Sequence, residues 1–188
     1  GHNRHFSPHL EQLHRWLLLR KNPLVIQYRV NSGFVPSDHW VHSEGEGRSR
    51  IVGEMTHFID LLNSITGSSI SRVHAERIGG DNQSAVNNDN IAVTFKFEEG
   101  SVANLTYAAS GDKAYSREKI EIFFEGNTMV SEDFRISKKH FGGKTETFKT
   151  HGQEMGYREE LKHFISLFKG EESKTVTLNE AFQTMRTV

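Results

Sequence analysis

The stretch RIVGEMTHFIDLL, from Arg50 to Leu62, is the most informative part of this chain. Its apolar residues recur at helical spacing and share one side with the next apolar residue downstream: Ile51, Val52, Met55, Phe58, Ile59, Leu62 and Ile65. The polar positions share the opposite side: Arg50, Glu54, His57, Asp60 and Ser64. The pattern predicts an amphipathic helix of about four turns that ends at Gly67, a residue suited to the position after a helix.

Two carboxylates flank an imidazole on the polar side of this predicted helix. Residues three apart on a helix are neighbours, so Glu54 and Asp60 are each within reach of His57. A carboxylate can orient an imidazole that titrates near neutrality, so the three residues are candidates for acid/base catalysis. The alternative is an ordinary solvent-exposed helix surface, which is usually rich in such residues.

Composition excludes several classes of protein. The chain has 188 residues, which suits one well-packed domain, and its formal net charge is -1. The charge balance and the lack of a long apolar run argue against binding to nucleic acid or to a membrane. The absence of cysteine removes disulfides, thiolate nucleophiles and zinc–thiolate sites, and it fits the reducing cytoplasm. The 11 histidines are scattered, and no metal site is expected.

The order of the predicted elements indicates the fold class. A helix should begin at Ser7-Pro8 and reach Arg20-Lys21, followed by a strand over Leu24–Asn31 and a loop over 32–49. After the central helix, strands are expected at Ile70–Ile78, Ile91–Phe97, Val102–Tyr107, Ile120–Phe124, Thr128–Val130, Arg135–Ser137 and Thr145–Lys149, with a polar loop at 81–88. Helices should cover Tyr157–Lys169 and start again near Leu178. This order predicts an α+β fold with a large, mostly antiparallel or mixed open sheet and helices on one face.

The second face of this sheet would be left uncovered by helices. Alternation in Ile91–Phe97 places four apolar residues on one face and small or polar residues on the other. Such a mixed second face suits a subunit interface, which would make the protein a homo-oligomer. A solvated sheet surface explains the pattern equally well.

Several segments together resemble a known family. They are GHNRHFSP at 1–8, YRVN at 28–31, GEMTHFID at 53–60 and DNIAVTFKFEEGS at 89–101, followed by the C-terminal helices. In this order they resemble the C-terminal substrate domain of the Gfo/Idh/MocA oxidoreductases, over essentially the whole chain. GFVPSDHW at 33–40 resembles the branch fused to alcohol-dehydrogenase-like modules. The resemblance implies the fold of a glyceraldehyde-3-phosphate dehydrogenase-like C-terminal domain.

The resemblance also implies a domain that this sequence does not contain. Family members bind NAD or NADP through an N-terminal Rossmann domain, which carries a Gly-rich phosphate turn and a Glu-Lys-Pro lysine. Residues 1–188 include neither motif, and Arg77–Asp81 (RIGGD) does not supply the turn. We therefore expect a single substrate-binding and oligomerisation domain, inactive without its Rossmann domain. The complete enzyme would oxidise the CH–OH group of a sugar, sugar nucleotide or polyol.

The family pattern assigns His57 as the acid/base or orienting group beside the substrate hydroxyl. Many members carry Asp four residues before this histidine, where this chain has Gly53. Glu54 is a possible substitute, although it projects about 100° away around the helix. Asp60 matches the Asp of a His-x-x-Asp pattern and is either a helix cap or a partner of His57.

Substrate and cofactor contacts are expected at five further positions and at the domain junction. Arg29 and Asn31 share one face of a strand that resembles the family's pocket strand, where Arg29 could bind an anion or simply pair with a Glu. In the following loop His39, Trp40 and His42 could contact a sugar, with burial of Trp40 in the core as the alternative.

Asn3 and Arg4, at the start of the chain, could approach the nicotinamide. Lys113 is either a polar contact or part of a surface loop.

Two other classes of protein fit parts of the pattern. Glu54-x-x-His57 has the spacing of a di-metal helix, but that site needs a second such helix, and Glu160-x-x-His163 is a poor candidate for it. A sugar-binding or dimerisation scaffold that retained the fold without the chemistry is the other alternative, and Gly53 favours it.

Overall fold

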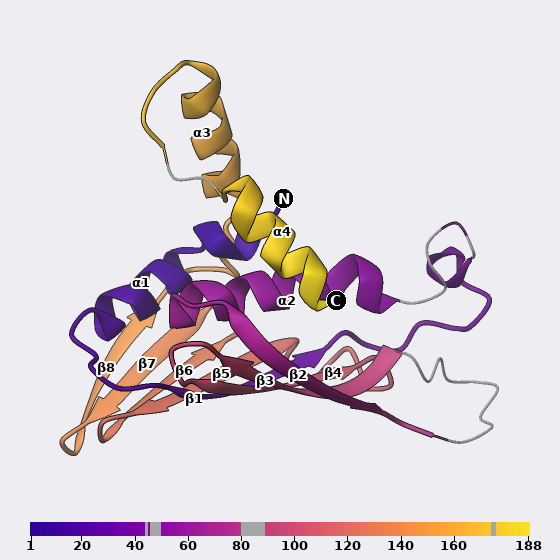
Figure 1. The fold of residues 1–188 in the computed structure, drawn as a ribbon, viewed down its shortest axis with the longest axis horizontal. Coiled ribbons are helices and arrows are strands. Elements are labelled where there is room, and N and C mark those ends of the chain that lie inside the picture. Colours follow the sequence, from indigo (N-terminus) through magenta and orange to yellow (C-terminus); the bar gives the residue numbers. More distant parts are fainter. Residues whose placement is uncertain (44, 46–49, 80–88, 174–175) are drawn as a thin grey trace.

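The computed structural model describes residues 1–43, 45, 50–79, 89–173 and 176–188. One eight-stranded sheet, in the order β2-β3-β4-β1-β5-β6-β7-β8, runs through the whole molecule. Helices α1, α2 and α4 lie on one face of this sheet, and α3 projects away from it (Figure 1). The α+β class with a mixed sheet and helices on one face is therefore confirmed.

The sheet is antiparallel except at its centre. Strand β1, Val25–Asn31, pairs in parallel with β4 and antiparallel with β5. The other strands are β2 Ile70–Arg77, β3 Asn90–Phe97, β4 Val102–Ala108, β5 Glu118–Phe124, β6 Asn127–Glu132, β7 Ile136–Phe141 and β8 Lys144–Lys149. Both predicted hairpins, β3–β4 and β5–β6, are confirmed. The predicted polar loop at 81–88 lies outside the described residues.

The helices begin where their sequences favour it, but the first ends at Leu17 and does not reach the expected Arg20-Lys21. They are the short 3-10 helices η1 Asn3–Phe6 and η2 Trp40–His42, and the α-helices α1 Pro8–Leu17, α2 Arg50–Thr66, α3 Tyr157–Phe168 and α4 Leu178–Thr187. Ser7 caps α1, with Pro8 at the first helical position. Gly67 follows α2 with φ 66°, a left-handed conformation that glycine adopts without strain.

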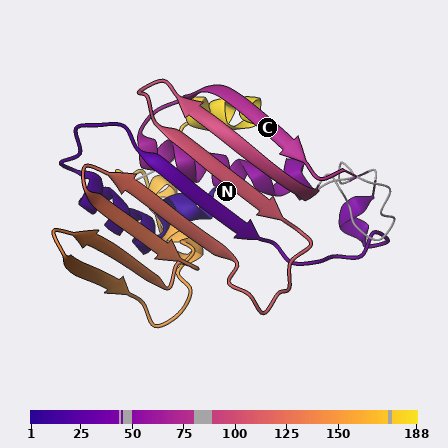
Figure 2. The ribbon, with the colours of Figure 1, turned by 90° about the horizontal axis from the view of Figure 1, so that it is seen from below.

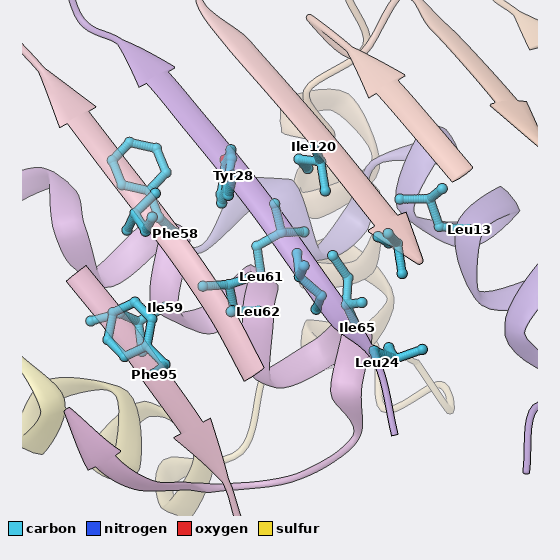
Figure 3. Close-up of a cluster of buried hydrophobic side chains, with 14 of the residues drawn as sticks. Leu13, Leu24, Tyr28, Phe58, Ile59, Leu61, Leu62, Ile65, Phe95 and Ile120 are labelled. Atoms are coloured by element: carbon cyan, nitrogen blue, oxygen red, sulfur yellow. The ribbon is translucent and has the colours of Figure 1, made fainter. Parts of the chain in front are cut away.

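The core lies between α1, α2 and the inner face of the sheet. Phe58, Leu61 and Leu62 from α2 pack against Tyr28 of the central strand and its neighbours, as the close-up shows (Figure 3). Inward-pointing residues alternate along β1, β4 and β5, as the period of a strand requires. This packing fixes α2 over the middle of the sheet.

No helix of the described residues lies on the outer face of the sheet (Figure 2). Val25 and Phe123 lie directly opposite each other on β1 and β5, and both are exposed there. Thr94 and Asn104 are joined by a hydrogen bond on the neighbouring strands, and Lys119 pairs with Glu121 at 3.0 Å. The outer face is therefore mixed in character, as the alternation in β3 predicts.

Helix α2 differs from its predicted amphipathic pattern at Val52, Asp60 and Arg50. Arg50 belongs to the polar side but is buried, and its guanidinium donates to the carbonyls of Gly33 and Ser32. Val52 is more than half exposed although it belongs to the apolar side, because the first turn of α2 is not covered there. Asp60 is buried although it belongs to the polar side, because η1 and α4 pack over the second half of the helix. Packing on two sides, rather than one, is the physical reason for the difference.

Candidate active site

His57 lies on α2, half-buried, with its ring edge-on to the ring of His2 at 5.5 Å. Its Nδ1 atom is buried and has no hydrogen-bond partner among the described residues. Burial, together with the positive charges of Arg4 and His2, lowers the pKa of His57 to about 4. The imidazole is therefore neutral at physiological pH and is a weaker base than a free histidine.

Asp60, one turn further along α2, anchors the start of the chain. Its Oδ1 lies 3.2 Å from Nδ1 of His2, and its Oδ2 lies 3.4 Å from Nδ1 of His5. Although burial alone would raise the pKa of Asp60, these contacts with His2 and His5 hold it below its usual value. Asp60 thus contacts His5 in η1 and His2, the residue just before η1. Among the described residues it has no hydrogen bond to His57.

The Glu54 carboxylate accepts hydrogen bonds from groups other than His57. Its Oε1 accepts a hydrogen bond from Nε of Arg50 at 3.0 Å, and its Oε2 accepts one from the Tyr107 hydroxyl at 2.9 Å. Arg117 lies 3.7 Å from the same carboxylate. Glu54 therefore links α2 to β4 and to the segment before β5, and it acts on His57 only through its charge.

Arg4 and Glu118 form a buried ion pair beneath this site. The guanidinium donates to both carboxylate oxygens of Glu118, at 2.9 and 2.6 Å, and the Tyr28 hydroxyl donates a third bond at 2.5 Å. The guanidinium also lies 4.9 Å above the ring of Phe58, the neighbour of His57. Burial disfavours the charged form of Arg4, but the bonds to Glu118 keep its pKa above the usual value.

The predicted cofactor contacts, Asn3 and Arg4, have their side chains inside the domain. Nδ2 of Asn3 donates to the Met155 carbonyl at 2.7 Å, and Arg4 is bound to Glu118. Both residues are buried. Their polar ends are therefore occupied, and the described residues include no Gly-rich turn that could bind a pyrophosphate.

Arg29 and Asn31 lie at the opposite side of β1 from α2. Tyr28 contacts Phe58 of α2, so strand alternation places Arg29 on the outer face of the sheet. There its guanidinium binds Ser116 and stacks over the ring of Tyr115 at 4.6 Å. Asn31, at the end of the strand, donates to the Asp112 carbonyl at 2.7 Å. The structure therefore does not bring these two side chains together with His57.

The loop after β1 has one exposed and one buried end. Trp40 is 65% exposed and tilts against the ring of His39 at 5.5 Å, so it does not fill the core. His42 is largely buried and lies 3.5 Å from Asp89, whose other oxygen accepts the backbone N–H of Arg50 at 2.8 Å. The loop is thereby tied to the start of α2. Lys113 packs over Gly33 in the same loop.

Comparison with known proteins decides the family. A model of the GFO/IDH/MocA C-terminal domain matches residues 22–130, more than half of the chain. The chain belongs to the GFO/IDH/MocA family. No curated protein sequence matches it.

Solved structures share the fold of this GFO/IDH/MocA domain. UDP-N-acetylglucosamine 3-dehydrogenase GnnA from Acidithiobacillus ferrooxidans superposes with a TM-score of 0.78 at 16% identity, over 100% of this chain and 57% of that one. The dehydrogenase MviM from Clostridium difficile gives 0.71 at 16% identity, over 100% of this chain and 58% of that one. A super-repressor mutant of Gal80p from Saccharomyces cerevisiae gives a TM-score of 0.76 at 15% identity, over 100% of this chain and 60% of that one. The chain thus spans less than two thirds of each.

The polar network of this GFO/IDH/MocA domain includes residues that were not predicted from the sequence. Glu118, Tyr28, Tyr107 and Arg117 join Arg4 and Glu54 into one network below α2. A usable signal existed for Glu118, since it shares the inward period of Ile120 and Ile122. A carboxylate at a core position indicates a buried partner.

Two features of the described part of the chain bear on other functions. None of its helices is long and apolar enough to cross a membrane. Within the same residues, no group of three or more His, Asp or Glu side chains is placed to hold a metal ion.

Proposed function

We propose that this chain is the substrate-side domain of an NAD(P)-dependent oxidoreductase that acts on the CH–OH group of a sugar, sugar nucleotide or polyol. The family supports the reaction class, and the half-buried His57, whose Nδ1 has no hydrogen-bond partner among the described residues, supports a place beside the substrate hydroxyl. The substrate class rests on the resemblance of the sequence. The solved GnnA structure is named as a sugar-nucleotide dehydrogenase, which agrees with this choice.

His57 is the residue on which the proposal depends. We assign Nε2 to the substrate hydroxyl, because Nδ1 is buried. Oxidation of a secondary alcohol requires removal of the hydroxyl proton, and a neutral imidazole within hydrogen-bond reach can accept it. The nicotinamide, when bound, accepts the hydride. Because the described residues offer no pyrophosphate site, we assign binding of NAD or NADP to a separate nucleotide-binding domain of the complete protein.

Glu54 and Asp60 take supporting roles in this proposal. Glu54 holds the start of α2 against β4 through Tyr107, and Asp60 holds His2 against His57. They are positioning residues, because Glu54 binds Arg50 and Tyr107 and Asp60 contacts His2 and His5.

We propose that the loop after β1 binds the part of the substrate that lies away from the reacting hydroxyl. His39 and Trp40 present an exposed aromatic surface that suits the face of a sugar ring, and His42 fixes the loop to the start of α2. Seven residues separate Arg50 from His57, a rise of about 10 Å along a helix, which is long enough for a sugar-sized substrate. Arg29 and Asn31, on the other side of β1, would at most support the segment over 111–117.

The outer face of the sheet is our candidate for association with a second copy of the chain. The exposed apolar pair Val25 and Phe123 lies at one end of the two middle strands, and the uncharged Thr94 and Asn104 lie on β3 and β4. A patch of this composition suits the core of a homo-oligomer interface. We place the complete protein in the cytoplasm, because a chain without cysteine fits a reducing compartment.

A non-catalytic scaffold is the second candidate. Two observations favour it: Gly53 stands where many members carry Asp, and a protein named as a repressor shares the fold. Nicotinamide reduction by the complete protein, tested on sugars, inositols and sugar nucleotides with the 188-residue chain as the control, separates the two. Turnover by the complete protein alone supports the dehydrogenase. Cofactor binding without turnover on any substrate would favour the scaffold.

A further inference from the structure

Arg117 differs from the other arginines of the polar network below α2 because its guanidinium is accessible. Its side chain is 48% exposed, whereas Arg4 and Arg50 are buried. Its Nη2 lies 3.7 Å from Oε2 of Glu54, and its Nε lies 3.7 Å from Oε1 of Glu118. Both distances are too long for a hydrogen bond. Among the described residues, the Arg117 guanidinium therefore donates no hydrogen bond.

The two carboxylates near Arg117 are bound by other groups. Glu118 accepts hydrogen bonds from Arg4 at both of its oxygens. Glu54 accepts one from Arg50 at Oε1 and one from a tyrosine hydroxyl at Oε2. These five charged side chains comprise three guanidinium groups and two carboxylates, so one positive charge is in excess. Arg117 carries that excess charge at the accessible edge of the network.

The backbone of Arg117 is held in place at the end of the central strand. Its carbonyl accepts the backbone N–H of Asn31 at 2.7 Å. The guanidinium of Arg29 binds both the carbonyl and the hydroxyl of Ser116, the preceding residue. Arg29 and Asn31 thus fix the segment from which Arg117 extends. A fixed backbone reduces the conformational entropy that is lost when a side chain binds a ligand.

Glu54 connects the Arg117 guanidinium to the vicinity of His57. Glu54 precedes His57 by three residues on α2, and residues at this spacing on a helix have Cβ atoms about 5–6 Å apart. Burial lowers the pKa of His57, and the nearby charge of Glu54 opposes this shift. A substrate that places a hydroxyl at His57 can therefore present a charged substituent to Arg117.

We propose that Arg117 binds an anionic group of the substrate, a phosphoryl group or a carboxylate, and so selects a charged sugar derivative over a neutral sugar or polyol. This inference rests on the proposed function. A guanidinium suits this role, because its N–H groups can donate two parallel hydrogen bonds to a phosphate or a carboxylate. The excess positive charge offsets the repulsion between the anion and the two carboxylates of the network.

Ligand binding to the complete protein tests this role without measuring turnover. Isothermal titration calorimetry compares sugar nucleotides (UDP-glucose and UDP-galactose), sugar acids (glucuronate and galacturonate) and neutral compounds (glucose, galactose and myo-inositol). The cofactor site is first saturated with NADH or NADPH, so that a nucleotide probe does not bind there. Arg117→Gln removes the charge, and Arg117→Lys keeps the charge without the two-point geometry. Arg135→Gln, at an exposed position, is the matched control.

We expect the wild type to bind at least one class of charged probe about tenfold or more tightly than the neutral compounds. Arg117→Gln should weaken that binding about tenfold or more, Arg117→Lys should weaken it less, and Arg135→Gln should leave it unchanged. A loss limited to the UDP-sugars identifies a phosphoryl group as the ligand of Arg117. A loss limited to the sugar acids identifies a carboxylate.

Equal binding of the charged probes by the wild type and by Arg117→Gln would overturn the role of Arg117. Equal affinity of the wild type for charged and neutral probes, or no binding of any charged probe, would overturn it as well. Turnover of a neutral polyol would then leave the proposed dehydrogenase activity standing. Conversely, charge-selective binding through Arg117 in a complete protein without turnover would support this inference while the proposed activity fails. An unchanged unfolding midpoint in both Arg117 variants shows that a loss of binding is not a loss of the fold.

Discussion

Arg4 and Glu118, 114 residues apart in the sequence, form a two-point ion pair that is almost fully buried beneath α2. Tyr28 adds a hydrogen bond to the same carboxylate, and burial together with the Glu118 charge raises the pKa of Tyr28 well above its usual value. The pair joins η1 to the central strands, and so it holds the segment that carries His2 against His57. Its removal should loosen the site and the fold together.

Glu118→Gln should lower the free energy of unfolding by about 3 kcal/mol, because the buried guanidinium of Arg4 would lose its counter-charge. Urea unfolding measures this loss, with Glu132→Gln at an exposed position of the neighbouring strand as the control. A loss at Glu118 no larger than that of the control would mean that the ion pair contributes little.

Gly53 offers a gain-of-function test of the site. A Cβ atom there meets nothing within 4 Å, so Gly53→Ala should stabilise the domain by about 1 kcal/mol through helix propensity alone. Gly53→Asp places a carboxylate one turn before His57 and should raise the pKa of His57 above its value of about 4. NMR titration of the imidazole measures this shift. An unchanged His57 pKa in the Asp variant, with Ala as the matched control, would show that position 53 does not face His57.

His9 should make the domain sensitive to acid. Its two ring nitrogens are hydrogen-bonded to the hydroxyls of Ser137 and Thr150, and burial lowers the pKa of His9 to about 4. Between pH 6.5 and 4 the unfolded chain binds the proton that the folded domain excludes, so stability falls as the pH falls through this window. His57, with a similar pKa, adds to the same loss. Thermal unfolding should show a smaller loss from pH 7 to pH 4.5 in His9→Gln than in the wild type, and equal losses would contradict this.

Phe123→Arg should reduce self-association, because it introduces a charge into the exposed apolar pair that Phe123 forms with Val25 on the outer sheet face. Phe141→Arg, at an exposed end of the β7–β8 hairpin, is the control. Light scattering after size exclusion gives the mass of each variant. If the wild type and Phe123→Arg have the same oligomeric mass, the interface does not lie at Phe123.

Local sequence signals predicted most of the fold. The alternation in β1, β3 and β5, the cap at Ser7 and the turn residues 98–101 each act within a few residues, so they can be found from the sequence alone. The partners of Asp60 and Glu54 could not be predicted in this way, since they depend on how η1 and β4 meet α2. Spacing on one helix indicates which side chains are neighbours, but it does not show which neighbour from another element competes for them. Arg29 illustrates the same limit, because its strand face was predicted but not the side on which α2 packs.

His57→Ala in the complete protein tests the central claim most directly. Turnover of nicotinamide should fall about 10²- to 10⁴-fold, the usual contribution of a general base, with the unfolding midpoint nearly unchanged. His74→Ala, on the exposed edge strand β2, should retain full activity. Full turnover in His57→Ala would contradict the assignment of His57 as the proton acceptor.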